Sequence, residues 1–215
     1  MRKRVAESSK NESLVSIGKR HILYDATLIE HPHSELFDIN TAKQHADEQS
    51  LAEGRGHAVF FKHQQQDLVL KHYQRGGRMA TLLGDKYIGA DCNRSRSFRE
   101  WRLLKQMSEM ELPVPTPVAA SCIKHGMFYR ADLITRQINN VVTLADHLLQ
   151  TECDEITWRA VGACIRKFHE ASIYHADLNA RNILLNPDAG TVYLIDFDKG
   201  SVRYLGESWK ASNLA

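Results

Sequence analysis

The apolar residues in the first half of the chain come in short runs, rich in β-branched residues and bounded by turn formers, which is the pattern of β-strands. Residues 1–18 are polar and are expected to be frayed. Residues 75–91 predict an irregular insertion around a short helix. The regular elements expected here are a strand at 21–29, a short helix at 41–50 and a strand at 67–73. Residues 53–61 are expected to form a glycine-containing turn that leads into a further strand, which pairs with 67–73 as a hairpin.

Two later segments have the 3.6-residue period of amphipathic helices. Residues 95–110 place an apolar stripe in line with Glu100, and residues 155–171 form the longest helix of this kind. The prolines within 112–117 end the first helix and force an extended segment. The other elements expected are strands at 119–123, 126–134, 183–186 and 191–195 and a short helix at 143–149.

Strands around one helix are thus followed by helices around a small hairpin. This order predicts a two-lobed α+β fold, with a strand-rich lobe at residues 1–135 and a reduced helical lobe at residues 136–215. With 43% hydrophobic and 25% charged residues, the composition excludes a disordered chain, a collagen-like fibre and a coiled coil. No run approaches the roughly 18 apolar residues of a membrane span, and the basic start lacks the apolar stretch of a secretory signal, so a cytoplasmic protein is expected.

The spacing of the cysteines argues against a zinc site and against a set of structural disulfides. Zinc sites usually show closely spaced ligand pairs, and disulfide frameworks are typical of small, cysteine-dense chains. We therefore expect reduced, mostly packed thiols at the four scattered cysteines, Cys92, Cys122, Cys153 and Cys164.

The net charge of +2 conceals a strongly basic segment. Between Lys71 and Lys105 there are nine basic and three acidic residues, which gives this segment a charge of +6. Such a concentration indicates an anionic partner: the phosphates of a nucleotide, a phospholipid surface or a nucleic acid. Of these partners, we do not expect a nucleic acid.

The residues most suggestive of chemistry lie in the last fifth of the chain. Asp177 is followed by Asn182 five positions on and by Asp196 at the end of the next expected hairpin. A carboxylate such as Asp177 can accept the proton of a hydroxyl group, while Asn182 and Asp196 offer the oxygen ligands that Mg²⁺ prefers. The alternative is that these are ordinary turn-forming residues. The paired spacing favours chemistry, because it resembles the catalytic loop and metal-binding Asp of the protein-kinase-like superfamily.

That resemblance implies further parts upstream. Gly54 and Gly56 precede an expected strand, as a loop over ATP phosphates would, although the third glycine of such loops is replaced. Lys71 lies in a strand where it would contact the α- and β-phosphates, and Glu100 would orient that lysine. The competing role for Glu100 is a helix capping box with Ser97. Backbone groups on the strand that enters the hinge would meet adenine, at Ile134 and Arg136.

Three departures from protein kinases indicate a different acceptor. The loop from His175 to Asp177 lacks the arginine that holds a phosphorylated activation loop, and Asp196 begins an Asp-Phe-Asp motif without the usual glycine. Only 17 residues follow Asp198, too few for a peptide-binding helical lobe. A small-molecule or lipid-linked hydroxyl is therefore the expected acceptor, and His169 and His175 are expected to be structural.

Five longer stretches extend the resemblance: VLKHYQRGGRMA (69–80), RSRSFREWRLL (94–104), LPVPTP (112–117), YHADLNARNILL (174–185) and LIDFDKG (194–200). From about Tyr24 onward the chain is similar to the bacterial 3-deoxy-D-manno-octulosonic acid (Kdo) kinases of the lipopolysaccharide kinase family. This resemblance implies ATP-dependent, Mg²⁺-assisted phosphorylation of the 4-hydroxyl of a Kdo residue on a lipid A precursor. It also implies a peripheral protein on the cytoplasmic side of the bacterial inner membrane. Residues 207–215 look like the start of a helix cut short, which suggests a truncated chain.

Under this resemblance the basic segment has a specific partner. A Kdo–lipid A precursor carries phosphates and a carboxylate, which arginine binds in a bidentate manner. The alternatives are an inner-core heptose kinase of the same family, a RIO-like atypical protein kinase and an inactive nucleotide-binding scaffold. The intact set of Lys71, Asp177, Asn182 and Asp196 argues against the scaffold. The residues expected to bind the acceptor and an anionic membrane are Arg75, Arg78, Arg94 and Arg96.

Overall fold

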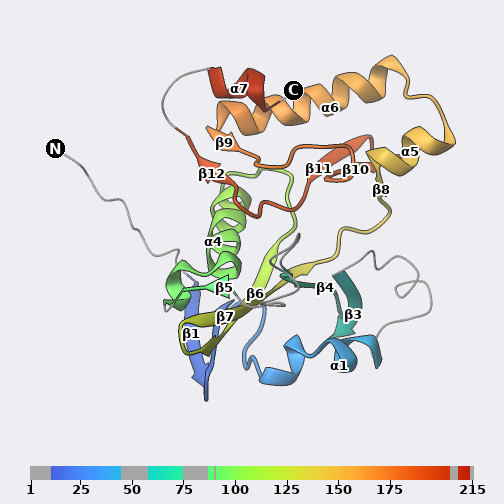
Figure 1. Ribbon diagram of the computed structural model, residues 1–215. Coiled ribbons are helices and arrows are strands. Elements are labelled where there is room, and N and C mark those ends of the chain that lie inside the picture. Colours follow the sequence, from blue (N-terminus) through green and yellow to red (C-terminus); the bar gives the residue numbers. More distant parts are fainter. Residues whose placement is uncertain (1–10, 45–57, 75–86, 90, 204–207, 214–215) are drawn as a thin grey trace. The chain divides into compact units, whose positions relative to one another are not determined.

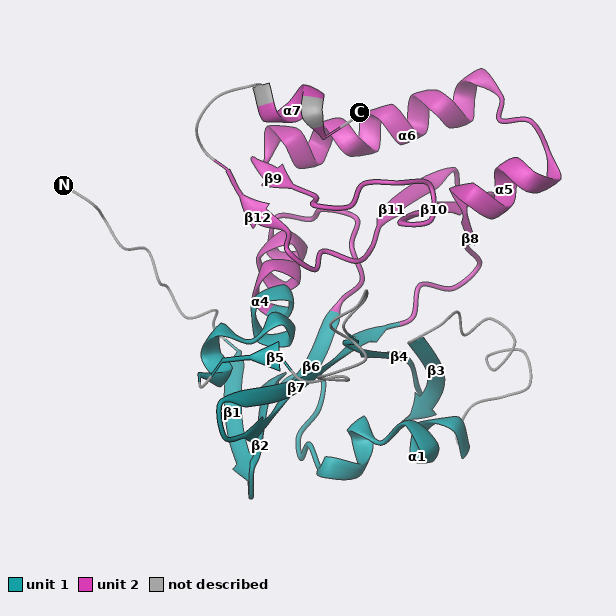
Figure 2. Cartoon of the chain, in the orientation of Figure 1, with its two compact units in different colours: residues 1–101, 117–136 teal, residues 102–116, 137–215 magenta. Residues whose placement is uncertain are grey.

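The computed structural model describes residues 11–44, 58–74, 87–89, 91–203 and 208–213 (Figure 1). The chain forms two compact units, residues 1–101 with 117–136 and residues 102–116 with 137–215, called unit 1 and unit 2 below (Figure 2). The predicted boundary between the lobes lies between residues 135 and 136. In the structure a boundary between the units lies between residues 136 and 137, and the helix predicted at 95–110 contributes residues to both units.

Unit 1 is built on an antiparallel sheet. Within the described ranges it has seven strands in the order β1-β2-β6-β7-β4-β3, with β5 also paired to β7. The hairpin expected from the sequence is present, formed by β3 and β4, and the strands expected at 119–123 and 126–134 form a second hairpin, β6 with β7. The strands are β1 (Glu12–Ile17), β2 (Arg20–Asp25), β3 (Ala58–His63), β4 (Gln66–His72), β5 (Tyr87–Ile88), β6 (Pro117–His125) and β7 (Phe128–Arg136).

The strand β1 corrects the prediction of a frayed segment at 1–18 for residues 12–17, while residues 1–10 lie outside the described residues. Its six residues pair with β2, from Glu12 opposite Asp25 to Ile17 opposite Arg20. Gly18 turns the chain between the two strands with a φ of +60°, a value that glycine adopts without strain. The apolar run in β1 is short, and only Val15 packs against the main hydrophobic cluster, so backbone pairing rather than burial defines this strand.

One face of the sheet in unit 1 is covered by two short helices, η1 (Ser34–Phe37) and α1 (Ile39–Gln44). The cluster formed there includes Leu36 and Phe37 from η1, Leu70 from β4 and Ile134 from β7, all less than 5% exposed. Side chains alternate between the two faces along a strand, so the neighbours of Leu70 in β4 project to the opposite face. The prediction of a helix at 41–50 holds for the described residues up to Gln44, although the helix begins earlier, at Ile39.

The helix α4 (Arg96–Glu109) begins in unit 1 and has the period expected from the sequence. The Ser95 hydroxyl accepts a hydrogen bond from the backbone N–H of Phe98, so Ser95 caps the helix. The Ser97 hydroxyl donates to the carbonyl oxygen of Ser121 in β6 at 2.8 Å. Along the helix the buried side chains recur every three or four residues, at Phe98, Trp101, Leu104 and Met107.

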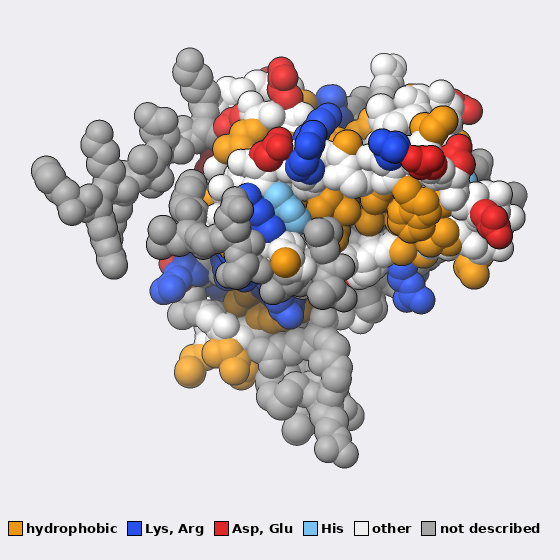
Figure 3. Space-filling model, turned by 90° about the horizontal axis from the view of Figure 1, so that it is seen from above, with side chains coloured by type: hydrophobic (Ala, Val, Ile, Leu, Met, Phe, Trp, Pro, Cys, Tyr) orange, Lys and Arg blue, Asp and Glu red, His pale blue; other side chains and the backbone are white. Residues whose placement is uncertain are grey.

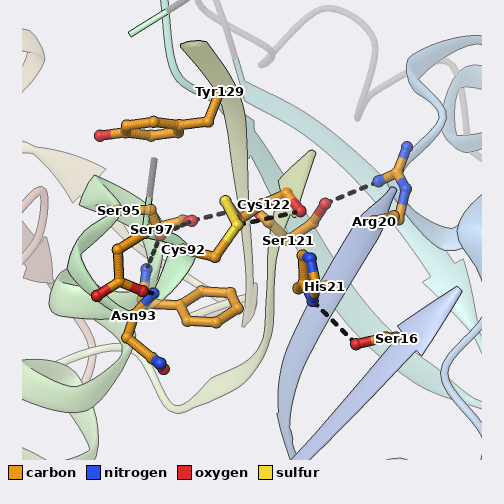
Figure 4. Close-up of a disulfide and its surroundings, with 12 residues drawn as sticks. Ser16, Arg20, His21, Cys92, Asn93, Ser95, Ser97, Ser121, Cys122 and Tyr129 are labelled. Atoms are coloured by element: carbon orange, nitrogen blue, oxygen red, sulfur yellow. Dashed lines mark hydrogen bonds between the residues drawn. A yellow bond between two sulfur atoms is a disulfide. The ribbon is translucent and has the colours of Figure 1, made fainter. Parts of the chain in front are cut away.

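A disulfide joins Cys92, in the short helix η2 (Cys92–Arg94), to Cys122 in β6 (Figure 4). The expectation that all four thiols are reduced is therefore wrong for this pair. The two cysteines are 30 residues apart, and only the packing of η2 against β6 brings them together, which cysteine spacing does not reveal. Cys153 and Cys164 are free thiols, as expected.

Unit 2 contains α5 (Leu144–Gln150) and α6 (Glu155–Glu170), which Thr143 and Asp154 cap at their N-termini. Helix α6 packs on β9 and β11 through Val161, Cys164 and Phe168. Within the described ranges the strands form a three-stranded sheet, β11-β10-β8, and a pair, β12-β9. The remaining elements are β8 (Val142–Thr143), β9 (Ile173–Tyr174), β10 (Ile183–Asn186), β11 (Thr191–Leu194), β12 (Ser201–Val202) and α7 (Ser208–Ser212).

Some hydrophobic side chains of unit 2 are exposed. On the face shown in Figure 3 they gather where α5 and the first turns of α6 lie. The exposed large hydrophobic residues of these two helices are Leu148, Leu149, Ile156 and Trp158. Of the helices in the described ranges, none combines the length and the apolar character that a bilayer span requires.

Candidate active site

Lys71 and Glu100 form an ion pair in unit 1. Lys71 is the penultimate residue of β4, and its Nζ lies 3.1 Å from Oε1 and 3.0 Å from Oε2 of Glu100 on α4. The Glu100 side chain is only 3% exposed, whereas that of Lys71 is 26% exposed. A buried carboxylate needs charge-assisted hydrogen bonds, and the Lys71 ammonium donates them. The Lys71 side chain nevertheless remains partly accessible to solvent.

The helix cap decides between the two roles predicted for Glu100. A capping box would place Ser97 before the helix and Glu100 three residues later. In the structure Ser95 is the capping residue, and Ser97 lies inside α4 with its hydroxyl on β6. Glu100 is therefore part of the ion pair with Lys71 and not of a capping box.

A polar network on the opposite face of the sheet holds β4 in place. His72 Nδ1 lies 2.5 Å from Oδ1 of Asp132 in β7, and the guanidinium of Arg20 lies 3.6 Å from Oδ2. Arg20 also donates to the Ser121 hydroxyl in β6 at 2.9 Å. Burial lowers the pKa of the Arg20 guanidinium, and the nearby Asp132 carboxylate opposes that effect. The network ties four neighbouring strands, β2, β6, β7 and β4, together on the face of the sheet opposite Lys71.

In unit 2, His175 fixes the loop that carries Asp177. The His175 ring is 2% exposed, and its Nε2 donates to the carbonyl oxygen of Ile195 at 2.8 Å. Its Nδ1 accepts from the backbone N–H of Asp177 at 3.1 Å. Because Nε2 donates and Nδ1 accepts, the ring is assigned as neutral with its proton on Nε2. His175 is thus structural, as expected, and joins the two segments that bear Asp177 and Asp196.

Asp177 and Asn182 are hydrogen-bonded to each other. The Asn182 amide nitrogen donates to the Asp177 carbonyl oxygen at 2.8 Å and to carboxylate Oδ2 at 3.3 Å. Asn182 is buried and Asp177 is exposed. The amide therefore holds the carboxylate in one orientation while leaving it open to a reactant.

Asp196 follows β11 and adopts an unusual backbone conformation. Its φ is +63°, in the left-handed region that non-glycine residues seldom occupy. The next residue, Phe197, is 1% exposed and stacks on Phe168 of α6, with ring centroids 5.6 Å apart. The Phe197 ring also lies 4.6 Å from the His175 ring. Anchoring by Phe197 allows the strained position to persist, as is common at functional sites.

The oxygen donors of this loop fit a magnesium ion. The Asn182 amide nitrogen makes both bonds to Asp177, so the amide oxygen points away from Asp177. Asp196 contributes a half-buried carboxylate. Mg²⁺ is usually held by one or two protein oxygens together with substrate phosphates. Within the described ranges no group of three or more His, Cys, Asp or Glu side chains is arranged to hold a metal ion. Asn182 and Asp196 are thus the residues of this loop that could hold such an ion.

The model of the lipopolysaccharide kinase (Kdo/WaaP) family matches residues 40–215. The chain belongs to this family. The resemblance inferred from the sequence is thereby confirmed.

Relatives in this family are named 3-deoxy-D-manno-octulosonic acid kinase. The one from Xylella fastidiosa (strain M23) is 41% identical over 162 residues, which are 75% of this chain and 64% of the relative. The relatives from Photobacterium profundum and Vibrio cholerae are 36% and 35% identical over 196 residues, or 91% of this chain and 82% and 83% of theirs. The chain thus matches somewhat less than two thirds of the length of the X. fastidiosa protein.

A solved structure supports the fold. "WaaP in complex with acyl carrier protein" matches with a TM-score of 0.50 and 17% identity, covering 75% of this chain and 65% of that one. At this identity the match concerns the fold alone. It confirms the two-lobed, protein-kinase-like α+β class expected from the sequence.

Several predicted site residues of this kinase family member stand apart from the two groups described above. Arg94 is exposed in η2. Ile134 lies inside the sheet, paired with β4 and β6, and Arg136 is the exposed last residue of β7. Gly54, Gly56, Arg75 and Arg78 lie outside the described residues.

Arg96 is held by aromatic residues. Its guanidinium donates to the Tyr87 hydroxyl at 2.8 Å and lies 4.8 Å from the centroid of that ring. It is also 5.7 Å from the centroid of the Tyr73 ring. Such stacking restricts the guanidinium, so Arg96 has a structural role in unit 1 that its place in a basic run does not indicate.

Sequence reasoning missed Tyr73 and Asn213. The Asn213 side chain donates to the His175 carbonyl oxygen at 2.5 Å and lies 3.3 Å from Nε2 of His169, so it braces the loop from the C-terminal side. Nothing in the local pattern points to Asn213. For Tyr73 a signal existed, because residues two apart in a strand share a face and Lys71 was already a candidate.

Proposed function

We propose that this chain is an ATP-dependent kinase that phosphorylates the 4-hydroxyl of a Kdo residue attached to a lipid A precursor. The observation that carries the proposal is the ion pair between Lys71 and Glu100, a buried carboxylate that orients an accessible ammonium. Phosphoryl transfer of the kinase type uses such a pair. The family and the names of the relatives support Kdo as the sugar.

The residues of unit 1 bind the nucleotide. The Lys71 ammonium neutralises the α- and β-phosphates, and Glu100 keeps it pointed toward them. Gly54 and Gly56 cover the phosphates with backbone N–H groups. Of the two residues predicted to bind adenine, Ile134 is paired with strands on both sides, so the backbone groups that bind adenine lie at Arg136, the last residue of β7, and just beyond it.

The residues of unit 2 act on the acceptor. Asp177 accepts the proton of the acceptor hydroxyl. The hydroxyl oxygen forms a bond to the γ-phosphorus of ATP, and the bond from that phosphorus to ADP breaks. His175 and Asn182 hold the Asp177 loop and carboxylate in place for this step. Mg²⁺ brought by ATP would be held by Asn182 and Asp196, where it supplies positive charge for the phosphates.

Arginines of the basic segment bind the anionic groups of the acceptor. Arg94 is the most accessible described candidate, and Arg75 and Arg78 belong to the same basic run. Arg96, stacked on two tyrosines, presents a fixed guanidinium. The same charges attract an anionic bilayer, at about 1 kcal/mol for each Lys or Arg near the surface, so the protein is peripheral on the cytoplasmic side of the inner membrane.

The decisive experiment is mass spectrometry of a purified Kdo–lipid A precursor after incubation with the protein and Mg·ATP. A gain of one phosphate on the Kdo-bearing acceptor is expected, and none on an acceptor without Kdo. Phosphate only on a heptose-bearing acceptor would assign the chain to inner-core heptose phosphorylation. No transfer to either sugar would refute the proposal.

Asp177→Ala is the matched variant for this assay. Loss of a positioned base lowers the rate by about 10²–10⁴-fold. ATP affinity should stay near that of the wild type, because the proposed contact of Asp177 is with the acceptor hydroxyl. Turnover within about threefold of the wild type would remove Asp177 from the mechanism.

A further inference from the structure

Tyr73 lies directly beside the ion pair of Lys71 and Glu100. It follows the last residue of β4 and extends the pairing with β7, because its backbone N–H donates to the Ala131 carbonyl oxygen at 3.1 Å. Residues two apart in an extended chain share a face, so Tyr73 projects to the same side of the sheet as Lys71. The side chain of Tyr73 is buried, with the residue only 3% exposed.

The Tyr73 side chain contacts both members of the pair. Its hydroxyl donates to Oε2 of Glu100, the oxygen that Lys71 Nζ also reaches at 3.0 Å. Its ring centroid lies 4.7 Å from Lys71 Nζ, within the range of a cation–π interaction. One tyrosine thus fixes the carboxylate through its hydroxyl and the ammonium through its ring.

This second donor matters when the lysine engages a phosphate. An ammonium group has three donors, and any that turn toward a phosphate are withdrawn from Glu100. A carboxylate that is 3% exposed cannot replace a lost donor with water, and an unpaired buried charge is costly. The Tyr73 hydroxyl remains on Glu100 throughout and keeps the carboxylate in place as the counter-ion.

We propose that Tyr73 is a positioning residue of the nucleotide site, which aims Lys71 by holding Glu100. The role rests on the proposed function, because it presumes that Lys71 binds ATP phosphates. It differs from ordinary core packing in one respect. Packing needs only the ring, which phenylalanine also supplies, whereas positioning needs the hydroxyl.

The test begins with Tyr73→Phe, which keeps the ring and removes the hydroxyl. The expected result is about tenfold weaker binding of Mg·ATP by isothermal titration and a matching rise in the KM for ATP, as for loss of a hydrogen bond to a charged group. The matched control is Tyr24→Phe, in β2 of the same unit and packed against the main hydrophobic cluster. That control should bind Mg·ATP like the wild type.

A double-mutant cycle shows whether Tyr73 acts through Glu100. Glu100→Gln removes the charge that the hydroxyl serves, so Tyr73→Phe in that background should weaken Mg·ATP binding by less than about twofold. An equal loss in both backgrounds, or no loss in the single variant, would overturn the positioning role alone. Failure of the wild type to bind Mg·ATP would overturn the proposed function and this role with it.

Discussion

At the scale of single residues, His175 shows how a buried side chain organises the loop near Asp177. Its two ring nitrogens bond the Asp177 N–H and the Ile195 carbonyl oxygen, so one neutral imidazole joins the segment bearing Asp177 to the segment bearing Asp196. The sequence places His175 two residues before Asp177 and predicts a structural role. The sequence does not identify Ile195 as the partner of His175. That contact forms only because the hairpin of β10 and β11 brings Ile195 back beside His175.

Replacing His175 with alanine is expected to lower both stability and turnover. Two partly buried backbone groups, the Asp177 N–H and the Ile195 carbonyl oxygen, lose their partners, which costs about 1–3 kcal/mol in the free energy of unfolding. The Asp177 loop loses its support, so kcat should fall by about tenfold or more. Urea unfolding and steady-state kinetics measure the two effects. His125→Ala, at the exposed end of β6, is the control. A variant as stable as this control would show that the two ring bonds contribute nothing.

At the scale of elements, the turn from Asp196 to Gly200 is packed too closely for larger side chains. A Cβ on Gly200 would lie 2.8 Å from the Phe197 carbonyl oxygen and 2.9 Å from Cδ2 of Leu103 on α4. The Gly200 N–H donates to that same carbonyl oxygen at 2.7 Å. Gly200 thus permits the tight turn that follows the buried Phe197.

Gly200→Ala is therefore expected to destabilise the protein by about 1–3 kcal/mol, the usual cost of overpacking. The shift of the Phe197 backbone should also weaken binding of Mg·ATP, if Asp196 serves the nucleotide as proposed. Gly162→Ala is the matched control, because nothing lies within 4 Å of a Cβ at that exposed position of α6. It should raise stability by about 0.5–1 kcal/mol through helix propensity. Equal thermal midpoints for the two variants would contradict this account.

The elements that the sequence predicts well are those defined by burial. The apolar stripes of α4 and α6 place both helices within two residues of their observed bounds. Strand β1 escapes prediction because backbone pairing defines it, and the disulfide escapes because it depends on η2 meeting β6. The pair of Lys71 and Glu100 was predicted from its resemblance to kinases. The contribution of Tyr73 was not predicted. Its spacing from Lys71 places both residues on one face of the strand, but that spacing does not reveal the hydrogen bond to Glu100.

At the scale of the whole molecule, each unit carries a separate part of the proposed chemistry. Unit 1 contains the ion pair and the disulfide, and unit 2 contains Asp177, Asn182 and Asp196. The disulfide closes a loop of about 30 residues that includes the start of α4, and loops of that size contribute about 3–4 kcal/mol by limiting the unfolded chain. The cysteines thus divide into a bonded pair in unit 1 and free thiols, Cys153 and Cys164, in unit 2.

Thiol labelling tests this division across the chain. Burial raises the pKa of the Cys164 thiol to about 11, so at pH 8 the native protein holds about a hundredfold less thiolate there than a thiol at its ordinary value of 9.0. Protein purified without reductant and denatured in iodoacetamide should be labelled at Cys153 and Cys164 alone. Prior reduction should add Cys92 and Cys122. In the native protein at pH 8, Cys164 should resist labelling, and peptide mass spectrometry identifies each site. Labelling of Cys92 or Cys122 without reduction would show that the disulfide does not form. Rapid labelling of native Cys164 would contradict its burial on the face of α6 that packs on β11.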